Sequence, residues 1–458
     1  MKKSPIPSRH LLARSTATRR GLTFALAAAL AACGGGDSTS GGSSTAAGAD
    51  GRSRALAAPT SLAVAIPQVA DPVFDNLTIP ANAATQGMWG PPQAWPMNAI
   101  HAALLPDGKL LSYGAPKDTD AQDGRTFDVW DPTLGFGTGA HATTVEAGRN
   151  NSFCSTAEWL PDGRLLVSGG NGSKGSQLFT PATQSAANDT AQLADERWYA
   201  TLLALPDGRA VMLGGIDPYT EGMYQNPDAA IQNGQVSMTP ELYTPGTGWR
   251  SLTGAISRDA FGPDNLRASY PRAWVAPSGE VFGISADRMW WLDVYANGGT
   301  GAVRVAGTFK GGPSSTVPVN TGATSSAVMF APGRVLQAGG NGGFNGDGFP
   351  ASNAATVFDI NGSAPVVTET AAMAFARRFP SATVLPDGRV LVTGGTRVGN
   401  NGGSDAVFAA ELWNPATGAW TTLASASRIR VYHSGALLMP NGTVMSLGGG
   451  TPGPQYNA

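Results

Sequence analysis

Residues 381–392 read Ser381-Ala382-Thr383-Val384-Leu385-Pro386-Asp387-Gly388-Arg389-Val390-Leu391-Val392. Two runs rich in apolar and β-branched residues flank a Pro-Asp-Gly turn, and this pattern predicts a β-hairpin. The turn recurs, in strict or looser form, at 105–108, 160–163, 205–208, 276–279, 331–333 and 439–442. The chain therefore carries seven copies of one hairpin unit, spaced about 50 residues apart.

Each hairpin is followed by further strand signals. Most copies reach a glycine pair such as Gly394-Gly395, then an apolar run such as Glu411-Leu412-Trp413, then a tryptophan-bearing run such as Gly418-Ala419-Trp420. Four short strands per unit at this period are typical of the kelch-type β-propeller. We therefore predict an all-β fold, a seven-bladed kelch propeller over residues 87–458, with its last blade incomplete.

The composition supports this fold class. The chain has 61 glycines and 33 prolines, the residues least suited to a helix interior. Charged residues make up 14%, against about 25% in an ordinary soluble domain. The net charge of −2 is not the positive charge that is typical of proteins that bind nucleic acid. A mainly helical protein and a nucleic-acid-binding protein are both excluded as interpretations.

The N-terminal region has the pattern of an export signal. Basic residues precede an apolar run at 21–32 that is too short to span a bilayer. The run ends in Leu30-Ala31-Ala32-Cys33, which resembles the lipobox of bacterial lipoproteins; a plain signal peptide with an incidental cysteine is the alternative. We predict a signal peptide over 1–32, lipidation at Cys33, a Gly/Ser/Ala-rich linker and lead-in over 33–86, and an extracytoplasmic lipoprotein that contacts the membrane only through its lipid anchor.

A set of chemically reactive residues falls at one register of the repeat. The positions nine residues before each turn glycine are Ala99, Cys154, Tyr199, Tyr270, Thr324, Phe379 and His433. Equivalent positions in a rotational repeat lie at similar height around the axis. A cysteine, two tyrosines and a histidine at that height suggest a metal site, although a lone cysteine is also common as a small buried apolar residue.

Three motifs at this register resemble those of the copper-radical oxidases, the family of galactose oxidase and glyoxal oxidase. They are Asn151-Ser152-Phe153-Cys154, Tyr270-Pro271, and Arg430-Val431-Tyr432-His433-Ser434. The resemblance implies that Tyr270 is a copper ligand that carries a radical and is joined to Cys154 by a thioether. It also implies that His433 is a second equatorial ligand and that Tyr432 is the axial ligand and base toward substrate. Trp198, beside Tyr199, is a candidate to stack over the radical ring.

The activity that the resemblance implies is oxidation of a small aldehyde or alcohol by O₂, which yields H₂O₂. Imidazole and phenolate ligands in a tetragonal array suit Cu(II) better than zinc or calcium. A tyrosine–cysteine unit and the copper would each store one oxidising equivalent, and no organic cofactor would be needed. The alternative is a propeller without catalytic activity that binds a glycan or a protein partner at the cell surface.

One part of the family pattern has no counterpart in this sequence. The family takes its second histidine ligand from a β-sandwich domain after the propeller, whereas this chain ends at Ala458, within its seventh repeat. We therefore expect a fragment of a longer product, or a protein weakened by loss of that ligand. His101 and His141 are the remaining histidines after the expected cleavage, and structural roles are expected for both.

Overall fold

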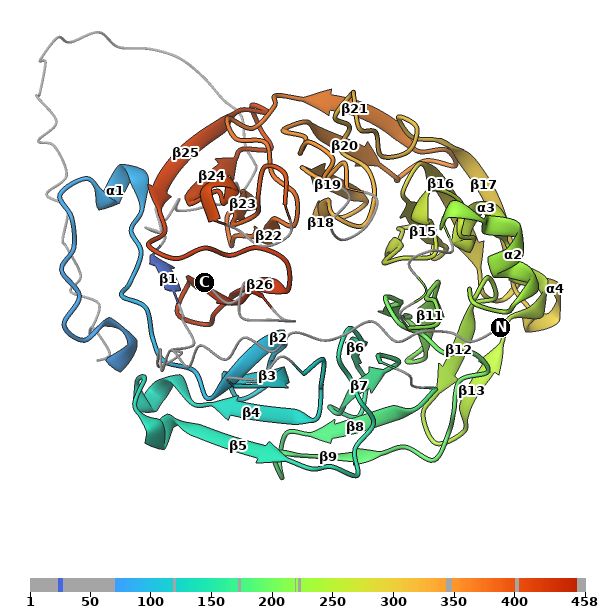
Figure 1. Cartoon of the computed structure of the whole chain (residues 1–458), viewed down its shortest axis with the longest axis horizontal. Coiled ribbons are helices and arrows are strands. Elements are labelled where there is room, and N and C mark those ends of the chain that lie inside the picture. The colour runs from blue at the N-terminus through green and yellow to red at the C-terminus, as the bar shows by residue number, and fades with distance from the viewer. Residues whose placement is uncertain are drawn as a thin grey trace, which may run out of the picture.

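The computed structural model describes the backbone of residues 24–27 and, in full, residues 71–117, 121–171, 174–218, 220, 224–342, 348–399 and 403–450. Six four-stranded antiparallel sheets surround a central axis like the blades of a propeller (Figure 1). In each sheet the strands follow chain order from the axis outward, so that every blade is built from one continuous segment. The predicted all-β propeller is confirmed.

The blades are regular in length and order. The first comprises β2 (Met97–Leu104), β3 (Leu110–Pro116), β4 (Thr126–Trp130) and β5 (His141–Val145). The second comprises β6 (Thr156–Trp159), β7 (Leu165–Ser168), β8 (Ser176–Thr180) and β9 (Ser185–Asn188). The third comprises β10 (Thr201–Ala204), β11 (Ala210–Leu213), β12 (Glu241–Thr244) and β13 (Gly248–Ser251).

The fourth blade comprises β14 (Arg272–Val275), β15 (Val281–Ser285), β16 (Arg288–Asp293) and β17 (Ala302–Thr308). The fifth comprises β18 (Ser326–Ala331), β19 (Arg334–Ala338), β20 (Ala355–Asp359) and β21 (Val366–Thr370). The sixth comprises β22 (Ser381–Val384), β23 (Val390–Thr393), β24 (Ala409–Trp413) and β25 (Trp420–Ser425).

The prediction of seven blades is wrong, because the described residues form six. The seventh repeat contributes only the hairpin of β26 (Ser434–Leu438) and β27 (Thr443–Gly448). The third strand of this sheet is β1 (Phe24–Ala27), which pairs antiparallel with β27. All seven predicted hairpins are present, but a hairpin becomes a blade only when two outer strands of the repeat follow it.

Glycine pairs join the second, third, fifth and sixth blades to the repeats that follow them. The amide of Gly215 donates to the carbonyl of Ala268 at 2.7 Å, and the amide of Gly395 donates to that of Arg430 at 2.6 Å. At Gly214, which has φ of +61°, a Cβ would lie 2.5 Å from the Ala268 oxygen. Only glycine provides both the left-handed conformation and the room for this close approach.

Two of these junctions are also held by buried ion pairs. Arg197 donates to the Glu241 carboxylate at 2.6 Å, and both side chains are almost fully buried. Its Nη1 donates to the carbonyl of Gly214. Arg377 and Glu411 repeat the arrangement three blades later, with Nη1 on the carbonyl of Gly394. A buried carboxylate thus fixes an arginine that holds the glycine junction in place.

The lead-in to the first blade is partly folded. Within the predicted linker, the 3-10 helix η1 (Pro72–Phe74) places Val73 in an apolar cluster with Trp95, Trp130 and Met445. The helix α1 (Ala83–Gln86) follows, and Trp89 Nε1 then donates to the carbonyl of Ala424 in β25. Residues 71–89 therefore pack on the propeller, because their apolar side chains find partners in the first and last repeats.

The other helices are short and lie in loops. They are η2 (Pro132–Leu134), η3 (Thr138–Ala140), α2 (Pro227–Gln232), η5 (Thr253–Ala255), α3 (Arg258–Phe261), η6 (Asp264–Leu266), α4 (Ala296–Gly299) and η7 (Gly403–Asp405). None of the helices in the described part of the chain has the length and apolarity that a membrane span requires. Cys33 and most of the predicted signal and linker lie outside the described residues, and those assignments stay predictions.

Candidate active site

The register predicted from the turn spacing forms a ring at the entrance to the inner strands. The inner strands follow one another around the axis; they are β2, β6, β10, β14, β18, β22 and β26. Strand β2 contains its ring position, and each of the others begins one or two residues after its own. Backbone hydrogen bonds link successive positions: the amide of Tyr199 donates to the Cys154 carbonyl, and that of Tyr270 donates to the Tyr199 carbonyl. The amide of Phe379 donates to the Thr324 carbonyl in the same way.

Five of the seven ring residues have a left-handed backbone. They are Cys154 (φ 59°), Tyr199 (59°), Tyr270 (48°), Phe379 (54°) and His433 (65°). This conformation costs a residue with a side chain about 1–2 kcal/mol, and glycine would adopt it without that cost. Strained backbone of this kind concentrates at functional sites, where the side chain is needed in that place.

The side chains of the ring meet one another. Tyr199 lies against Tyr270 with ring centroids 4.8 Å apart, and its hydroxyl is hydrogen-bonded to that of Tyr432. Tyr432 stacks on His433 at 3.7 Å, and Phe379 contacts Tyr432 at 5.0 Å. The structure thus brings together the four residues that the family motifs single out, although they lie up to 279 positions apart in sequence.

Cys154 lies beneath this group as a buried free thiol. Its Sγ is 3.6 Å from His433 Nε2. Burial raises the pKa of the thiol, and hydrogen bonds with Trp198, Tyr199 and Tyr270 partly offset that effect. The thiol therefore contacts the Tyr270 side chain that the resemblance names as its partner, and it contacts Tyr199 as well.

The phenols of the site are protonated in this environment. Burial raises the pKa of Tyr270, and the neighbouring Cys154 and Tyr432 raise it further. The pKa of Tyr199 is raised by burial first and then by Tyr432. A ligand that binds a phenolate here must therefore displace a proton.

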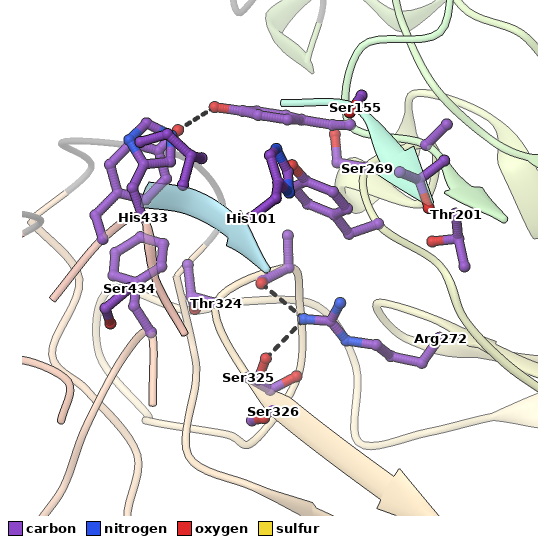
Figure 2. A pocket seen from close by; sticks show the side chains of 18 of the residues that line it. His101, Ser155, Thr201, Ser269, Arg272, Thr324, Ser325, Ser326, His433 and Ser434 are labelled. Atoms are coloured by element: carbon purple, nitrogen blue, oxygen red, sulfur yellow. Dashed lines mark hydrogen bonds between the residues drawn. The ribbon is translucent and has the colours of Figure 1, made fainter. Parts of the chain in front are cut away.

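A cavity of about 530 Å³ opens above the ring. Its wall includes the residues two positions after the ring, because alternate residues of a strand face the same side. They are His101, Thr156, Thr201, Arg272 and Ser326. Figure 2 shows His101, Arg272 and His433 reaching into this space from three separate segments. Counting back from each turn glycine predicted the ring. Arg272, two residues after Tyr270, was not predicted.

The two remaining histidines have different environments. His141 donates or accepts through Nδ1 at 2.8 Å from the Asp128 carboxylate, and its ring meets Trp95 edge-on, so that it has a structural role in the first blade. His101 lines the cavity and stacks on Tyr113 at 4.7 Å. Its Nε2 is buried and has no hydrogen-bond partner. Burial, with a smaller contribution from His433, lowers the pKa of His101 to about 3, so that the ring is neutral.

Trp198 and Tyr199 form a stack beside the ring. Their ring centroids are 3.8 Å apart, and Trp198 is almost fully buried next to Cys154. Trp198 thus stacks on Tyr199, which in turn lies against Tyr270. Tyr199 was predicted as one of the two tyrosines of the ring, and its contacts with both Tyr270 and Tyr432 place it among the central residues of the site.

The donor atoms gathered here are of a particular kind. No group of three or more histidine, cysteine, aspartate or glutamate side chains is placed to hold a metal ion in the described residues. The cavity instead offers phenols and imidazoles, and the Cys154 thiol is buried next to them. Borderline ligands such as imidazole and phenolate are suited to Cu(II), and a buried imidazole nitrogen without a partner is consistent with a metal or substrate at this place.

Sequence comparisons agree with this donor set. The family model described as glyoxal oxidase N-terminus matches residues 101–243. The chain is similar in sequence to galactose and glyoxal oxidases. Galactose oxidase of Gibberella zeae is 29% identical over 409 residues, which cover 83% of this chain and 55% of the relative. The aldehyde oxidase GLOX of Vitis pseudoreticulata is 26% identical, over 70% of this chain and 62% of the relative.

A comparison of structures gives the same fold. A fungal alcohol oxidase solved in complex with copper matches with a TM-score of 0.64 and 22% identity, over 81% of this chain and 74% of that one. The resemblance predicted from the three motifs is thus confirmed at the level of the family. The chain spans about half the length of the galactose oxidase that it matches.

Proposed function

We propose that the ring forms the centre of a copper-radical oxidase that oxidises a small alcohol or aldehyde with O₂. The observation that carries the proposal is the left-handed backbone at Cys154, Tyr199, Tyr270 and His433. A propeller that only binds a partner has no use for this strain, since glycine or small residues would line its axis at lower cost.

The residues divide into ligands and supporting groups. Tyr270, Tyr432 and His433 would hold the copper ion, and Cys154 would be joined to Tyr270 by a thioether. Bound Cu(II) would supply a one-electron acceptor, and the cross-linked phenol would supply the second. Tyr432 would accept the hydroxyl proton of the substrate. Because Tyr432 is hydrogen-bonded to Tyr199, the proton could then pass to the Tyr199 oxygen.

The overall reaction balances without another reagent. An alcohol carbon loses two electrons and two protons and becomes an aldehyde, and O₂ takes up both and becomes H₂O₂. A hydrated aldehyde reacts in the same way and gives a carboxylic acid. The cavity of about 530 Å³ has the size of a small-molecule site.

His101 is the candidate for a second imidazole within this chain. It is neutral, it lines the same cavity as His433, and its Nε2 has no protein partner. A neutral imidazole is the form that binds a metal. His141 does not line this cavity; it lies in the first blade, with its Nδ1 hydrogen-bonded to Asp128.

The test is a peptide mass map of the chain after exposure to Cu(II) in air. We expect a Cys154 peptide bonded to a Tyr270 peptide, two hydrogens lighter than the sum of the two. Tyr270→Phe is expected to abolish both this species and H₂O₂ production. Retained H₂O₂ production in Tyr270→Phe would contradict the proposal.

Two controls make the result specific. Tyr199→Phe retains the ring beside Cys154 and should leave the Cys154–Tyr270 species intact. A species that joins Cys154 to Tyr199 instead would move the radical to that tyrosine. Cys154→Ser should show neither species and should retain the fold, because serine has nearly the same size as cysteine.

A further inference from the structure

The wall of the cavity contains a guanidinium group that the proposed oxidation does not use. Arg272 begins β14, two residues after Tyr270, and its side chain points into the space between His101 and the 323–326 segment (Figure 2). Its Nη2 donates to the carbonyls of Ala323 at 3.1 Å and Ser325 at 2.8 Å. These contacts hold the head group in place, and they occupy only one of its three nitrogens.

No hydrogen bond from the other two nitrogens to the described part of the protein is found. Nε is buried without a hydrogen-bond partner. No aspartate or glutamate lies within ion-pair distance of Arg272 in the described residues, and none lines the cavity. Hydroxyl groups line the wall instead, and Ser155, Ser325 and Ser326 are among them.

Three other buried arginines of this chain have a carboxylate partner, whereas Arg378 and Arg430 donate to backbone carbonyls. Arg197, Arg267 and Arg377 each meet a buried carboxylate, from Glu241, Asp287 and Glu411 respectively. A buried charge without a counter-ion is costly, and the usual solution is a partner of opposite sign. Arg272 lines the cavity, so that a partner of opposite sign can reach it from there.

We propose that Arg272 binds the carboxylate of the substrate, so that this site takes small carboxylated alcohols or aldehydes, of the hydroxy-acid and oxo-acid class. A guanidinium matches a carboxylate in shape and charge, and the hydroxyls of Ser155 and Ser326 can donate to the same anion. The carboxylate would be held on the blade that carries Tyr270, which leaves the alcohol or aldehyde end free to approach the ring. The identity of the ligand as a substrate rests on the proposed oxidase function, whereas anion binding by Arg272 does not.

The test measures binding to the metal-free chain, so that a direct bond between the carboxylate and copper cannot contribute. The probes are glycolate and ethylene glycol, which differ by the carboxylate, and dissociation constants are measured by isothermal titration calorimetry. We expect glycolate to bind about 10–100-fold more tightly than ethylene glycol. Arg272→Gln should abolish that preference and leave the affinity for ethylene glycol unchanged.

Two further variants serve as controls. Arg272→Lys keeps the charge and should retain part of the preference, which shows that the folded cavity survives substitution at this position. Arg389→Gln makes the same change on an exposed turn, where the arginine is paired with Asp387, and should have no effect. Equal affinity of the wild type for both probes, or an unchanged preference in Arg272→Gln, would overturn the inference.

The outcome can be separated from that of the proposed function. A chain that forms the Cys154–Tyr270 species but binds both probes equally supports the oxidase and refutes the carboxylate site. A chain that never forms that species but loses glycolate binding in Arg272→Gln retains the anion site and refutes the oxidase. With the copper-loaded chain, the KM for glycolate should rise about 10–100-fold in Arg272→Gln, with a smaller change in kcat.

Discussion

Two regions of this propeller hold the left-handed backbone conformation, and they meet its cost differently. The junctions between blades use glycine pairs such as Gly214-Gly215, where a Cβ has no room and none is needed. The ring at the axis uses Cys154, Tyr199, Tyr270, Phe379 and His433 in the same conformation. The glycine junctions adopt positive φ without steric cost, whereas the ring residues adopt it at a cost. Tyrosine, cysteine and histidine occupy the left-handed region here despite its steric cost, which indicates that their side chains are needed at these positions.

The largest expected effect comes from a side chain placed in a junction. At Gly448, with φ of +73°, a Cβ would overlap the carbonyl oxygens of Ala99 and His433. Gly448→Ala should lower the free energy of unfolding by about 5 kcal/mol or prevent folding. Gly163→Ala is the matched control, because φ is +81° there but the space is open, and it should cost only about 1–2 kcal/mol. Equal urea midpoints for the two variants would show that close approach does not limit the junctions.

The second effect concerns the ion pairs that tie the junctions to the ring. Glu411→Gln leaves the buried guanidinium of Arg377 without its counter-charge and should lower the free energy of unfolding by about 3–5 kcal/mol. Asp387→Asn removes the carboxylate from an exposed pair with Arg389 and should cost less than about 1 kcal/mol. Chemical denaturation of both variants measures the difference. A small effect for Glu411→Gln would mean that the carbonyl acceptors suffice to hold Arg377.

The third effect reverses the usual order of alanine and glycine. At Cys154, glycine relieves about 1–2 kcal/mol of left-handed strain, against an entropic cost of about 0.5–1 kcal/mol. Cys154→Gly should therefore be more stable than Cys154→Ala by about 1 kcal/mol, while neither forms a bond to Tyr270. Thermal unfolding compares the two variants. The opposite order would mean that the ring carries little backbone strain.

The smallest effect is a dependence of stability on pH. The pKa of His101 is lowered to about 3 in the folded chain, against an ordinary value of 6.5. Between these values the unfolded chain binds a proton that the folded chain does not, so stability is lost as the pH falls from about 6.5 toward 3. In metal-free protein, His101→Asn should flatten the dependence of the urea midpoint on pH across this window. An unchanged slope would assign the acid sensitivity to other groups.

Much of this architecture could be predicted from the sequence, because its determinants are local. A Pro-Asp-Gly turn between apolar runs predicts a hairpin wherever it occurs, and all seven hairpins are present. The ring was predicted by counting back nine residues from each turn glycine. In a rotational repeat, residues at the same distance from the turn lie at the same height along the axis. The count of seven blades was wrong, because a blade also needs two outer strands, and in the described residues the seventh hairpin pairs only with β1.

The parts that sequence reasoning missed depend on contacts between distant segments. The buried pairs Arg197–Glu241 and Arg377–Glu411 join residues about 40 positions apart. The packing of Val73 against the first blade depends on a cluster that includes Met445. Arg272 could have been found, since it lies two residues after Tyr270 on the same strand face. Its lack of a carboxylate is visible only when the surrounding side chains are in place.

The ring has a consequence for how such a protein can change over generations. Each inner strand contributes one ring residue, and the backbone hydrogen bonds between neighbours hold these positions at a common height whatever side chain they carry. Ala99 and Thr324 are the two ring members without left-handed strain. Mutations there can alter the shape of the cavity while the strained, chemically constrained positions stay fixed. Two unstrained ring positions beside five strained ones would let a lineage acquire new substrates one residue at a time.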